Sequence, residues 1–136
     1  MSTDSNKKIV RRYFEDVLDQ RNLDVLDEIV AADCMIHRPE AFEPIRVREA
    51  YKHALKRILD VYSEFATTCR LSHRAVNLGE WTSRLGTHKL AGKTVTWPAI
   101  AVFRIRDGQI AEEWVSRDEL GMLIQLGVLA STDKLK

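Results

Sequence analysis

The chain has 136 residues, 45% of them hydrophobic, with 21 Lys and Arg against 20 Asp and Glu. A net charge of +1 gives no field for gathering nucleic acid or an anionic membrane surface. No apolar run approaches the roughly 20 residues of a membrane span, and the opening residues lack the apolar stretch of a secretory signal. We therefore expect one cytoplasmic domain over residues 1–136, with an ordered core of about 6–127.

The first half of the chain has helical periodicity. Apolar residues at helical spacing predict three helices, over Ile9–Leu18, Leu23–Val30 and Val47–Tyr62. Ser5 and Asn22 are suitable N-cap residues for the first two, because their side chains can accept a free backbone N–H. A short extended segment, Cys34–Arg38, ends at Pro39.

From Thr67 onward the apolar pattern changes to a period of two. Four strands are predicted, over Thr67–Val76, Trp81–Leu90, Thr94–Arg106 and Gln109–Arg117. Asp107-Gly108 between the last two is a strong hairpin signal. Helical spacing returns in Asp118–Leu126, and Gly127 is placed to end that helix.

This order predicts an α+β fold, with three N-terminal helices across the concave face of a curved, mostly antiparallel sheet. Strand alternation then leaves a convex face that the helices do not cover. Candidates for that outer surface are Val76, Ile100, Val102 and Val115. Because exposed apolar area commonly marks an interface, we expect a homodimer formed sheet to sheet.

Three segments together resemble a known family. They are Asn22–Asp33 leading to His37, then Gly86-Thr87-His88, then Phe103–Trp114 followed by Asp118 and Leu120–Gly127. In this joint order they are similar to the SnoaL-like polyketide cyclases of the nuclear-transport-factor-2-like superfamily. The resemblance covers about residues 6–127.

The resemblance implies a cone-shaped fold and an enzyme that acts on a small apolar, polyketide-like carbonyl compound. Characterised cyclases of this family close a ring by aldol condensation without a metal or an organic cofactor, while other members are hydroxylases. One segment departs from the family pattern. Only Lys89–Lys93 follows Gly86-Thr87-His88, where relatives carry a longer Gly/Pro-rich stretch that shapes the pocket mouth. The chemistry of the family can therefore persist here with a substrate other than a polyketide.

Asp118 matches the aspartate that serves as general acid and base in the cyclases. Strand alternation places it on one face with Ile110 and Trp114, directed inward, where loss of water would raise its pKa toward the working pH. The alternative is structural. Asp118 also stands where the last helix begins and can simply cap it.

Two histidines complete the catalytic set that the resemblance implies. His37 and His88 match pocket-lining positions in relatives, where a neutral imidazole can orient a carbonyl or share a proton with a carboxylate. Either can instead be an ordinary surface or core histidine. His53 and His73 lack this support, and we expect both to face solvent.

Five aromatic residues are candidates for contact with substrate. These are Tyr13, Tyr51, Trp97, Phe103 and Trp114. Each also suits the core, because buried tyrosines and tryptophans usually find a partner for their polar atom. As pocket walls they would suit a planar or terpenoid-like ligand.

The sequence shows no spacing typical of a metal site and no Gly-rich nucleotide loop, so we predict no metal and no cofactor. Two function classes remain. The first is a small acid–base enzyme, which includes cyclases, isomerases, dehydratases and hydroxylases. The second is a non-catalytic binding or assembly module of the same fold. The two differ in the site, because an open pocket with Asp118 capping a surface helix favours the module.

Overall fold

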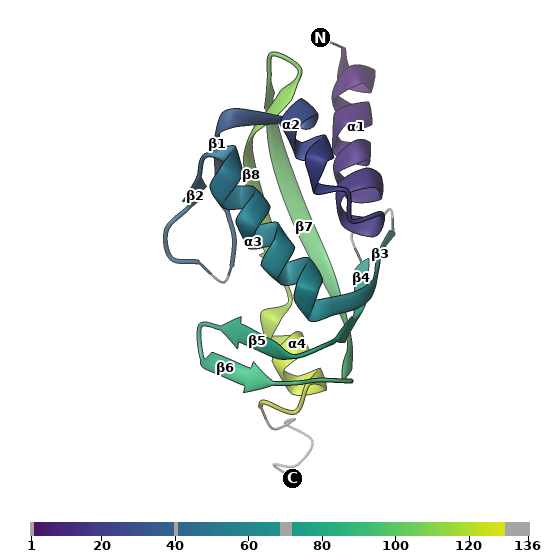
Figure 1. Cartoon of the computed structure of the whole chain (residues 1–136), viewed down its shortest axis with the longest axis vertical. Helices are drawn as coiled ribbons and strands as arrows, with labels where there is room; N and C mark the ends of the chain where they lie inside the picture. The colour runs from purple at the N-terminus through teal and green to yellow at the C-terminus, as the bar shows by residue number, and fades with distance from the viewer. Residues whose placement is uncertain (1, 40, 69–71, 130–136) are drawn as a thin grey trace.

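The structure is a computed structural model that describes residues 2–39, 41–68 and 72–129. It has the α+β architecture expected from the sequence, with helices on one side of a curved sheet (Figure 1). Within the described residues, no helix has the length and apolar character required to cross a bilayer. Of the two cysteines, Cys34 is a buried free thiol and Cys69 lies outside the described residues.

The N-terminal helices follow the predicted order with shifted ends. Their bounds are α1 (Thr3–Arg12), η1 (Tyr13–Asp19), η2 (Leu23–Val25), α2 (Leu26–Ile29) and α3 (Arg48–Val61). Ser2 rather than Ser5 caps α1, whereas Asn22 caps η2 as predicted. The first helix widens into a π-helical turn at Tyr13, a feature that often accompanies functional sites.

The main sheet has six strands in the order β2-β1-β8-β7-β4-β3. Their bounds are β1 (Val30–His37), β2 (Ile45–Arg46), β3 (Tyr62–Thr68), β4 (Ser72–Asn77), β7 (Thr94–Arg106) and β8 (Gln109–Arg117). β1 runs parallel to β8, and the other pairs are antiparallel. The predicted mostly antiparallel sheet is confirmed, and β7 and β8 have the predicted bounds.

Two predicted strands are divided differently in the structure. Trp81–Leu90 is a hairpin, β5 (Glu80–Ser83) and β6 (Gly86–Lys89), which forms its own two-stranded sheet. Thr67–Val76 covers the end of β3 and most of β4. The third helix also ends one residue early, because the chain becomes extended at Tyr62 and enters β3 directly.

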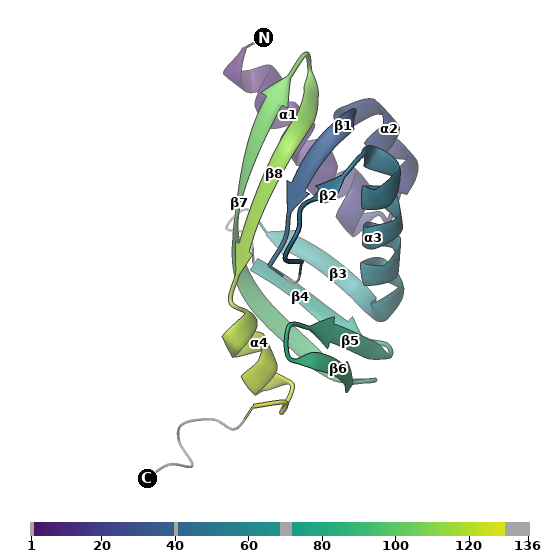
Figure 2. The ribbon, with the colours of Figure 1, turned by 90° about the vertical axis from the view of Figure 1, so that its left-hand side faces the viewer.

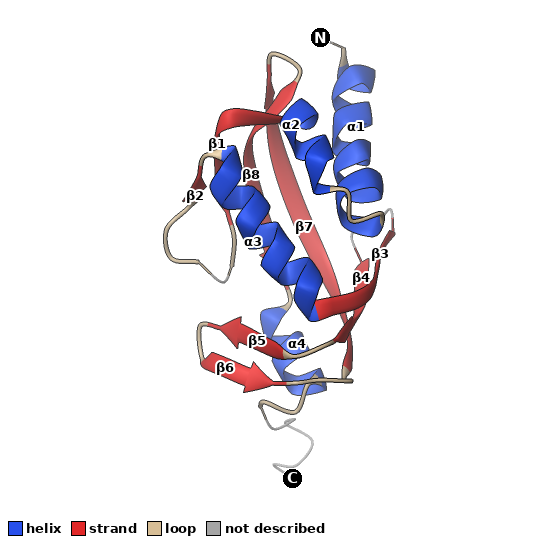
Figure 3. Cartoon of the chain, in the orientation of Figure 1, coloured by secondary structure: helices blue, strands red, loops and turns tan. Residues whose placement is uncertain are grey.

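The elements form two layers around the concave side of the sheet. Figure 2 shows α2 and α3 on one side of the β7–β8 hairpin and α1 crossing behind it, with the β5–β6 hairpin and α4 (Glu119–Gln125) near the opposite end of the molecule from the N-terminus. The same division of helix and strand is coloured in Figure 3. One core cluster lies beneath α1–α3, and a second lies beneath α4 and the β5–β6 hairpin.

The hairpin between β7 and β8 turns as the sequence predicts. Asp107 and Gly108 both have positive φ, 52° and 76°, as a two-residue turn of this kind requires. The pairing of β7 with β8 changes register shortly after this turn. Ile105 faces Ile110 and Arg104 faces Glu112, so Ala111 is an extra residue in β8, a β-bulge.

The bulge reverses which residues of β8 face the core. Ile110 is buried before it and Glu113 is buried after it, whereas Trp114 is 40% exposed. The predicted inward face through Ile110, Trp114 and Asp118 is therefore wrong beyond Ala111. An extra residue changes the parity of every later side chain in a strand of period two.

The outer face of the sheet carries an apolar patch. Ile100 and Val102 are 70% and 56% exposed, which confirms their predicted place, and Val102 pairs with Trp114 across the strands. We call Ile100, Val102 and Trp114 the outer patch. Val115, also predicted to face outward, instead lines the interior because of the bulge.

Candidate functional site

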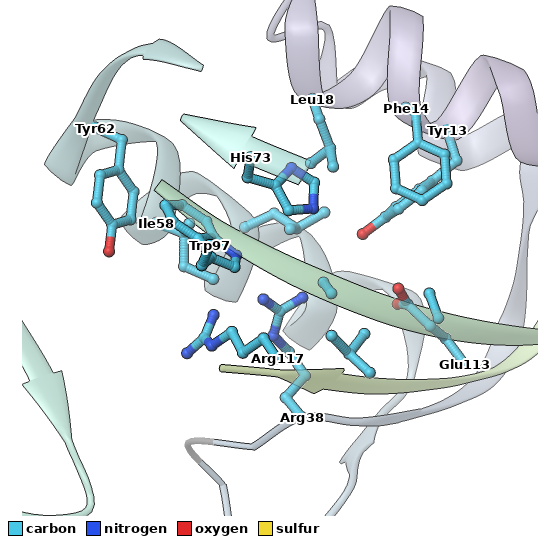
Figure 4. A pocket seen from close by; sticks show the side chains of 14 residues that line it. Tyr13, Phe14, Leu18, Arg38, Ile58, Tyr62, His73, Trp97, Glu113 and Arg117 are labelled. Atoms are coloured by element: carbon cyan, nitrogen blue, oxygen red, sulfur yellow. The ribbon is translucent and has the colours of Figure 1, made fainter. Parts of the chain in front are cut away.

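A small cavity lies between the two core clusters and is the centre of the candidate site (Figure 4). Its volume is about 50 Å³. The apolar side chains that define its walls include Phe14, Leu18, Leu55, Ile58, Tyr62, Trp97 and Val115. The polar side chains in its lining are Tyr13, Arg38, His73, Glu113 and Arg117. An apolar cavity with a few convergent polar groups is the usual form of a small-molecule site.

A hydrogen-bonded chain of three side chains borders the cavity. The Tyr51 hydroxyl donates a hydrogen bond to Glu113 Oε2 at 2.7 Å, and the hydroxyls of Tyr13 and Tyr51 form a hydrogen bond with each other. All three are buried, and Glu113 is only 2% exposed. A buried carboxylate is costly unless it accepts hydrogen bonds, so the tyrosines stabilise Glu113 in this position.

The two tyrosines keep their protons at neutral pH. Burial raises the pKa of Tyr13, and the negative charge of Glu113 raises it further. The same two causes raise the pKa of Tyr51 well above its ordinary value. Both hydroxyls are therefore hydrogen-bond donors and not phenolates.

These three residues come from distant parts of the chain. Tyr13 begins the π-helical turn η1, Tyr51 is on the inner face of α3, and Glu113 is the second residue after the bulge in β8. Tyr13 also packs edge-on against Phe103, with ring centroids 5.7 Å apart. Tyr13 thus lines the cavity, whereas Tyr51 and Phe103 are not part of its lining.

His73 is a cavity residue that the sequence analysis missed. It was expected to face solvent, but its side chain is buried and it pairs in register with Trp97 from β7. The ring centroids of His73 and Trp97 are 5.3 Å apart. Burial, followed by the positive charges of Arg117 and Arg38, lowers the pKa of His73 to about 4. The imidazole is therefore neutral at physiological pH and can donate one N–H.

Arg117 connects the cavity with a second, open space. Its side chain is 7% exposed and binds Glu119 at 3.0 Å. The open hollow has a volume of about 470 Å³ and shares Val115 and Arg117 with the cavity. Its other lining residues are Pro39, Arg84, Ser116, Asp118, Glu119 and Leu120.

Asp118 lies in the wall of this outer hollow and is exposed. Its Oδ1 accepts a hydrogen bond of 2.8 Å from the backbone N–H of Gly121, so Asp118 caps α4. The carboxylate faces Gly121 so closely that a Cβ at that position would collide with it. The structural alternative raised by the sequence is therefore real, and the predicted inward orientation of Asp118 is wrong.

His37 and Trp114 come together on the outer face, away from the cavity. Their rings are parallel, with centroids 5.3 Å apart, and they pair in register across β1 and β8. His37 Nε2 is 2.9 Å from Glu112 Oε1, and Arg104 donates to the other Glu112 oxygen at 3.0 Å. Neither His37 nor Trp114 lines the cavity or the outer hollow.

His88 is on the β5–β6 hairpin, apart from both spaces. Its Nε2 is 3.2 Å from the Ser83 hydroxyl, and its ring is 6.2 Å from that of Trp81. The structure thus does not bring Asp118, His37 and His88 into one site. Trp97 and Tyr13 are the predicted aromatic residues that do line the cavity.

One of the missed residues, His73, had a signal in the sequence, and another, Glu113, had none that selects it. His73 and Ala75 are two residues apart in a strand, so their side chains lie on the same face, and both are buried. Glu113 is one of two adjacent glutamates before Trp114, and regular alternation selects the wrong one. The bulge at Ala111 decides between them, and nothing in Gln109–Arg117 marks it. Among the described residues, no group of three or more His, Cys, Asp or Glu is placed to hold a metal ion.

Comparison with known proteins agrees with this architecture. The family model for a SnoaL-like domain matches residues 10–113. The structure of TsrD from Streptomyces laurentii is similar at a TM-score of 0.80 and 18% identity, covering 95% of this chain and 99% of that one. No curated protein sequence matches the chain significantly.

Two further structures share the fold. A SnoaL-like polyketide cyclase from Agrobacterium tumefaciens has a TM-score of 0.71 and 16% identity, over 93% of this chain and 100% of that one. A steroid delta-isomerase from Pseudomonas aeruginosa has a TM-score of 0.61 and 19% identity, over 94% and 89%. At these identities the likeness concerns the fold.

Proposed function

The chain belongs to the SnoaL-like domain family, and we propose that it is a small enzyme that moves a proton beside a carbonyl group without a cofactor, as in aldol-type cyclisation or a related isomerisation. One observation carries the proposal. Glu113 is a carboxylate buried in the wall of an apolar cavity and supported by two protonated tyrosines. Solved structures of the same fold include a SnoaL-like polyketide cyclase and a steroid delta-isomerase.

In this proposal Glu113 is the general base. It removes a proton from the carbon next to the substrate carbonyl, while Tyr51 keeps donating to Oε2. Neutral His73 donates its N–H to the carbonyl oxygen as that oxygen gains charge, and the positive charge of Arg38 favours the same change. Protonated Glu113 then returns the proton to the product. A positioned acid–base group of this kind contributes roughly 10²–10⁴-fold to the rate.

The cavity limits the size of the reacting group. A volume of about 50 Å³ holds only a few heavy atoms. The fused rings of a polyketide need a larger space, such as the outer hollow. The polyketide-like substrate suggested by the resemblance therefore requires either movement of the wall or binding mostly in that hollow.

The catalytic roles suggested by the resemblance form a second assignment. Asp118 lines the outer hollow, next to Arg117, and could act on a group bound there. His37 and His88 do not line this hollow, because they belong to the outer face and to the β5–β6 hairpin. We favour Glu113, since it is enclosed and Asp118 is exposed.

Proton exchange at a simple ketone tests the assignment. The probe is 4-phenylbutan-2-one in D₂O, with loss of the protons beside its carbonyl followed by NMR. Glu113→Gln is expected to lower the protein-dependent exchange rate by about 10²-fold or more. Glu112→Gln is the matched control, because Glu112 precedes Glu113 but binds His37 on the outer face.

Asp118→Asn separates the two assignments. It keeps the size and capping ability of the side chain, and we expect exchange at the parent rate. Parent-rate exchange in Glu113→Gln together with a large loss in Asp118→Asn would move the base to Asp118. If the parent protein produced no exchange, the non-catalytic binding module would be favoured, the alternative that the exposed helix cap Asp118 supports.

We also propose that the protein forms a homodimer through the outer patch. The patch is apolar, lies on β7 and β8, and continues across β1 through the stacked His37 and Trp114. A contiguous exposed apolar surface of this kind commonly marks an interface.

A further inference from the structure

The cavity has unlike charges on one strand. Glu113 and Arg117 are four residues apart on β8 and both line the cavity. A strand advances about 3.3 Å per residue, so their Cα atoms are separated by roughly 13 Å. Figure 4 shows Glu113 and the Tyr13 hydroxyl on one side of the cavity, with the guanidinium groups of Arg38 and Arg117 below His73 and Trp97.

We propose that the site takes an oxo acid, a ligand whose carboxylate binds Arg117 and Arg38 while its carbonyl end lies beside Glu113. Only the position of the reacting end rests on the proposed function. The anion site depends on the two arginines alone. Guanidinium groups pair with carboxylates through charge-assisted hydrogen bonds, which are among the strongest in proteins.

The positive charge at this end reaches the cavity interior. The positive charges of Arg117 and Arg38 disfavour the charged form of the buried His73 imidazole. Two carboxylates belong to this surrounding: Glu113, which lines the cavity and accepts a hydrogen bond from Tyr51, and Glu119, which binds Arg117 from α4. Glu119 also fixes the direction of the Arg117 side chain, which is a requirement for an anion site with a defined geometry.

The position of Arg117 also suits entry from solvent. It belongs to the lining of both the cavity and the outer hollow, so a carboxylate held there lies at the junction of the two. The short carbonyl end then occupies the cavity of about 50 Å³, and any larger body of the ligand extends into the hollow of about 470 Å³.

The test compares a carboxylate with its neutral amide. The probes are 4-oxopentanoate and 4-oxopentanamide, which have the same carbonyl end and nearly the same shape, and their affinities are measured by NMR titration. We expect the carboxylate to bind about tenfold more tightly, the difference expected for hydrogen bonds to a charged group. Arg117→Gln and Arg38→Gln should each remove most of that preference and leave amide binding within about twofold.

Arg104→Gln is the matched control. Arg104 is also an ion-paired arginine on the sheet, but it binds Glu112 on the outer face. Equal affinity for both probes, failure of the parent to bind either, or a preference that survives in both cavity variants while they remain folded would overturn the proposal. Arg38→Gln provides an independent answer if loss of the Arg117–Glu119 pair unfolds the chain.

The same titrations separate this inference from the proposed function. Proton exchange beside the ketone of 4-oxopentanoate reports the base, and affinity reports the anion site. Tight carboxylate binding without exchange keeps the anion site and rejects the enzyme. Glu113-dependent exchange on both probes with equal affinity keeps the enzyme and rejects the anion site.

Discussion

Tyr51 and Glu113 are 62 residues apart in the sequence and are joined by a hydrogen bond of 2.7 Å in the interior. The bond ties α3 to β8, and Tyr13 extends it to the π-helical turn of the first helix. The site and the packing of helices on the sheet therefore share the same contacts. Substitutions among the three hydrogen-bonded side chains, Tyr13, Tyr51 and Glu113, should therefore affect stability as well as activity.

Tyr51→Phe should destabilise the fold. The substitution removes the donor to a carboxylate that stays buried, at a cost of about 1–3 kcal/mol in the free energy of unfolding. Chemical denaturation at pH 7 measures it. Tyr13→Phe is the matched control, because the Tyr51–Glu113 bond remains, and it should cost less. Equal losses of unfolding free energy in the two variants would contradict the claim that the hydrogen bond from Tyr51 to buried Glu113 stabilises the fold.

Stability should fall as the pH falls from about 6.5 to about 4, in part because of His73. Its pKa is lowered from 6.5 to about 4 in the folded state. In that pH range the unfolded chain binds a proton that the folded chain does not, so acid favours unfolding. The contribution is present in full above the unfolded value and is lost as the pH approaches the folded value.

His73→Asn should flatten this pH dependence. The comparison is between unfolding curves of parent and variant at several pH values from 4 to 8. His53→Asn is the control, because His53 is exposed on α3. A variant at position 73 with the same pH slope as the parent would show that His73 is not the buried group responsible.

Loss of the Asp118 carboxylate should weaken α4. Asp118→Ala removes an N-cap and should cost about 1 kcal/mol, whereas Asp118→Asn keeps a capping oxygen and should cost little. Gly121→Ala should also destabilise the helix, because the new Cβ meets the Asp118 side chain. Thermal melting measures all three. Parent-like melting of Asp118→Ala would contradict the capping role.

The outer patch should hold a dimer together. Val102→Asp places a charge at its centre, beside Trp114, and should shift the protein to a monomer in light scattering at micromolar concentration. Leu78→Lys is the control, because Leu78 is 54% exposed but lies away from the patch. A parent protein that is monomeric at these concentrations would reject the interface.

Much of the fold could be predicted from local patterns. The period-two alternation of Thr94–Arg106 and Gln109–Arg117 located β7 and β8, and Asp107-Gly108 located their turn. Apolar spacing located α3 to within one residue at each end. These features depend on neighbours in the sequence, where side-chain periodicity and turn chemistry act directly.

The interior of the site depended on long-range pairing. A single extra residue, Ala111, moves Glu113 inward and Trp114 outward, and it is defined only by how β8 pairs with β7 and β1. The burial of His73 likewise follows from its pairing with Trp97, which lies on a strand 24 positions later in the chain. Strand alternation fixes which residues share a face, and the register of the sheet decides which face is buried. The sequence by itself therefore determined the family and the order of elements, while tertiary packing decided that Glu113, His73 and Arg117 meet in the cavity and that Asp118 caps a helix outside it.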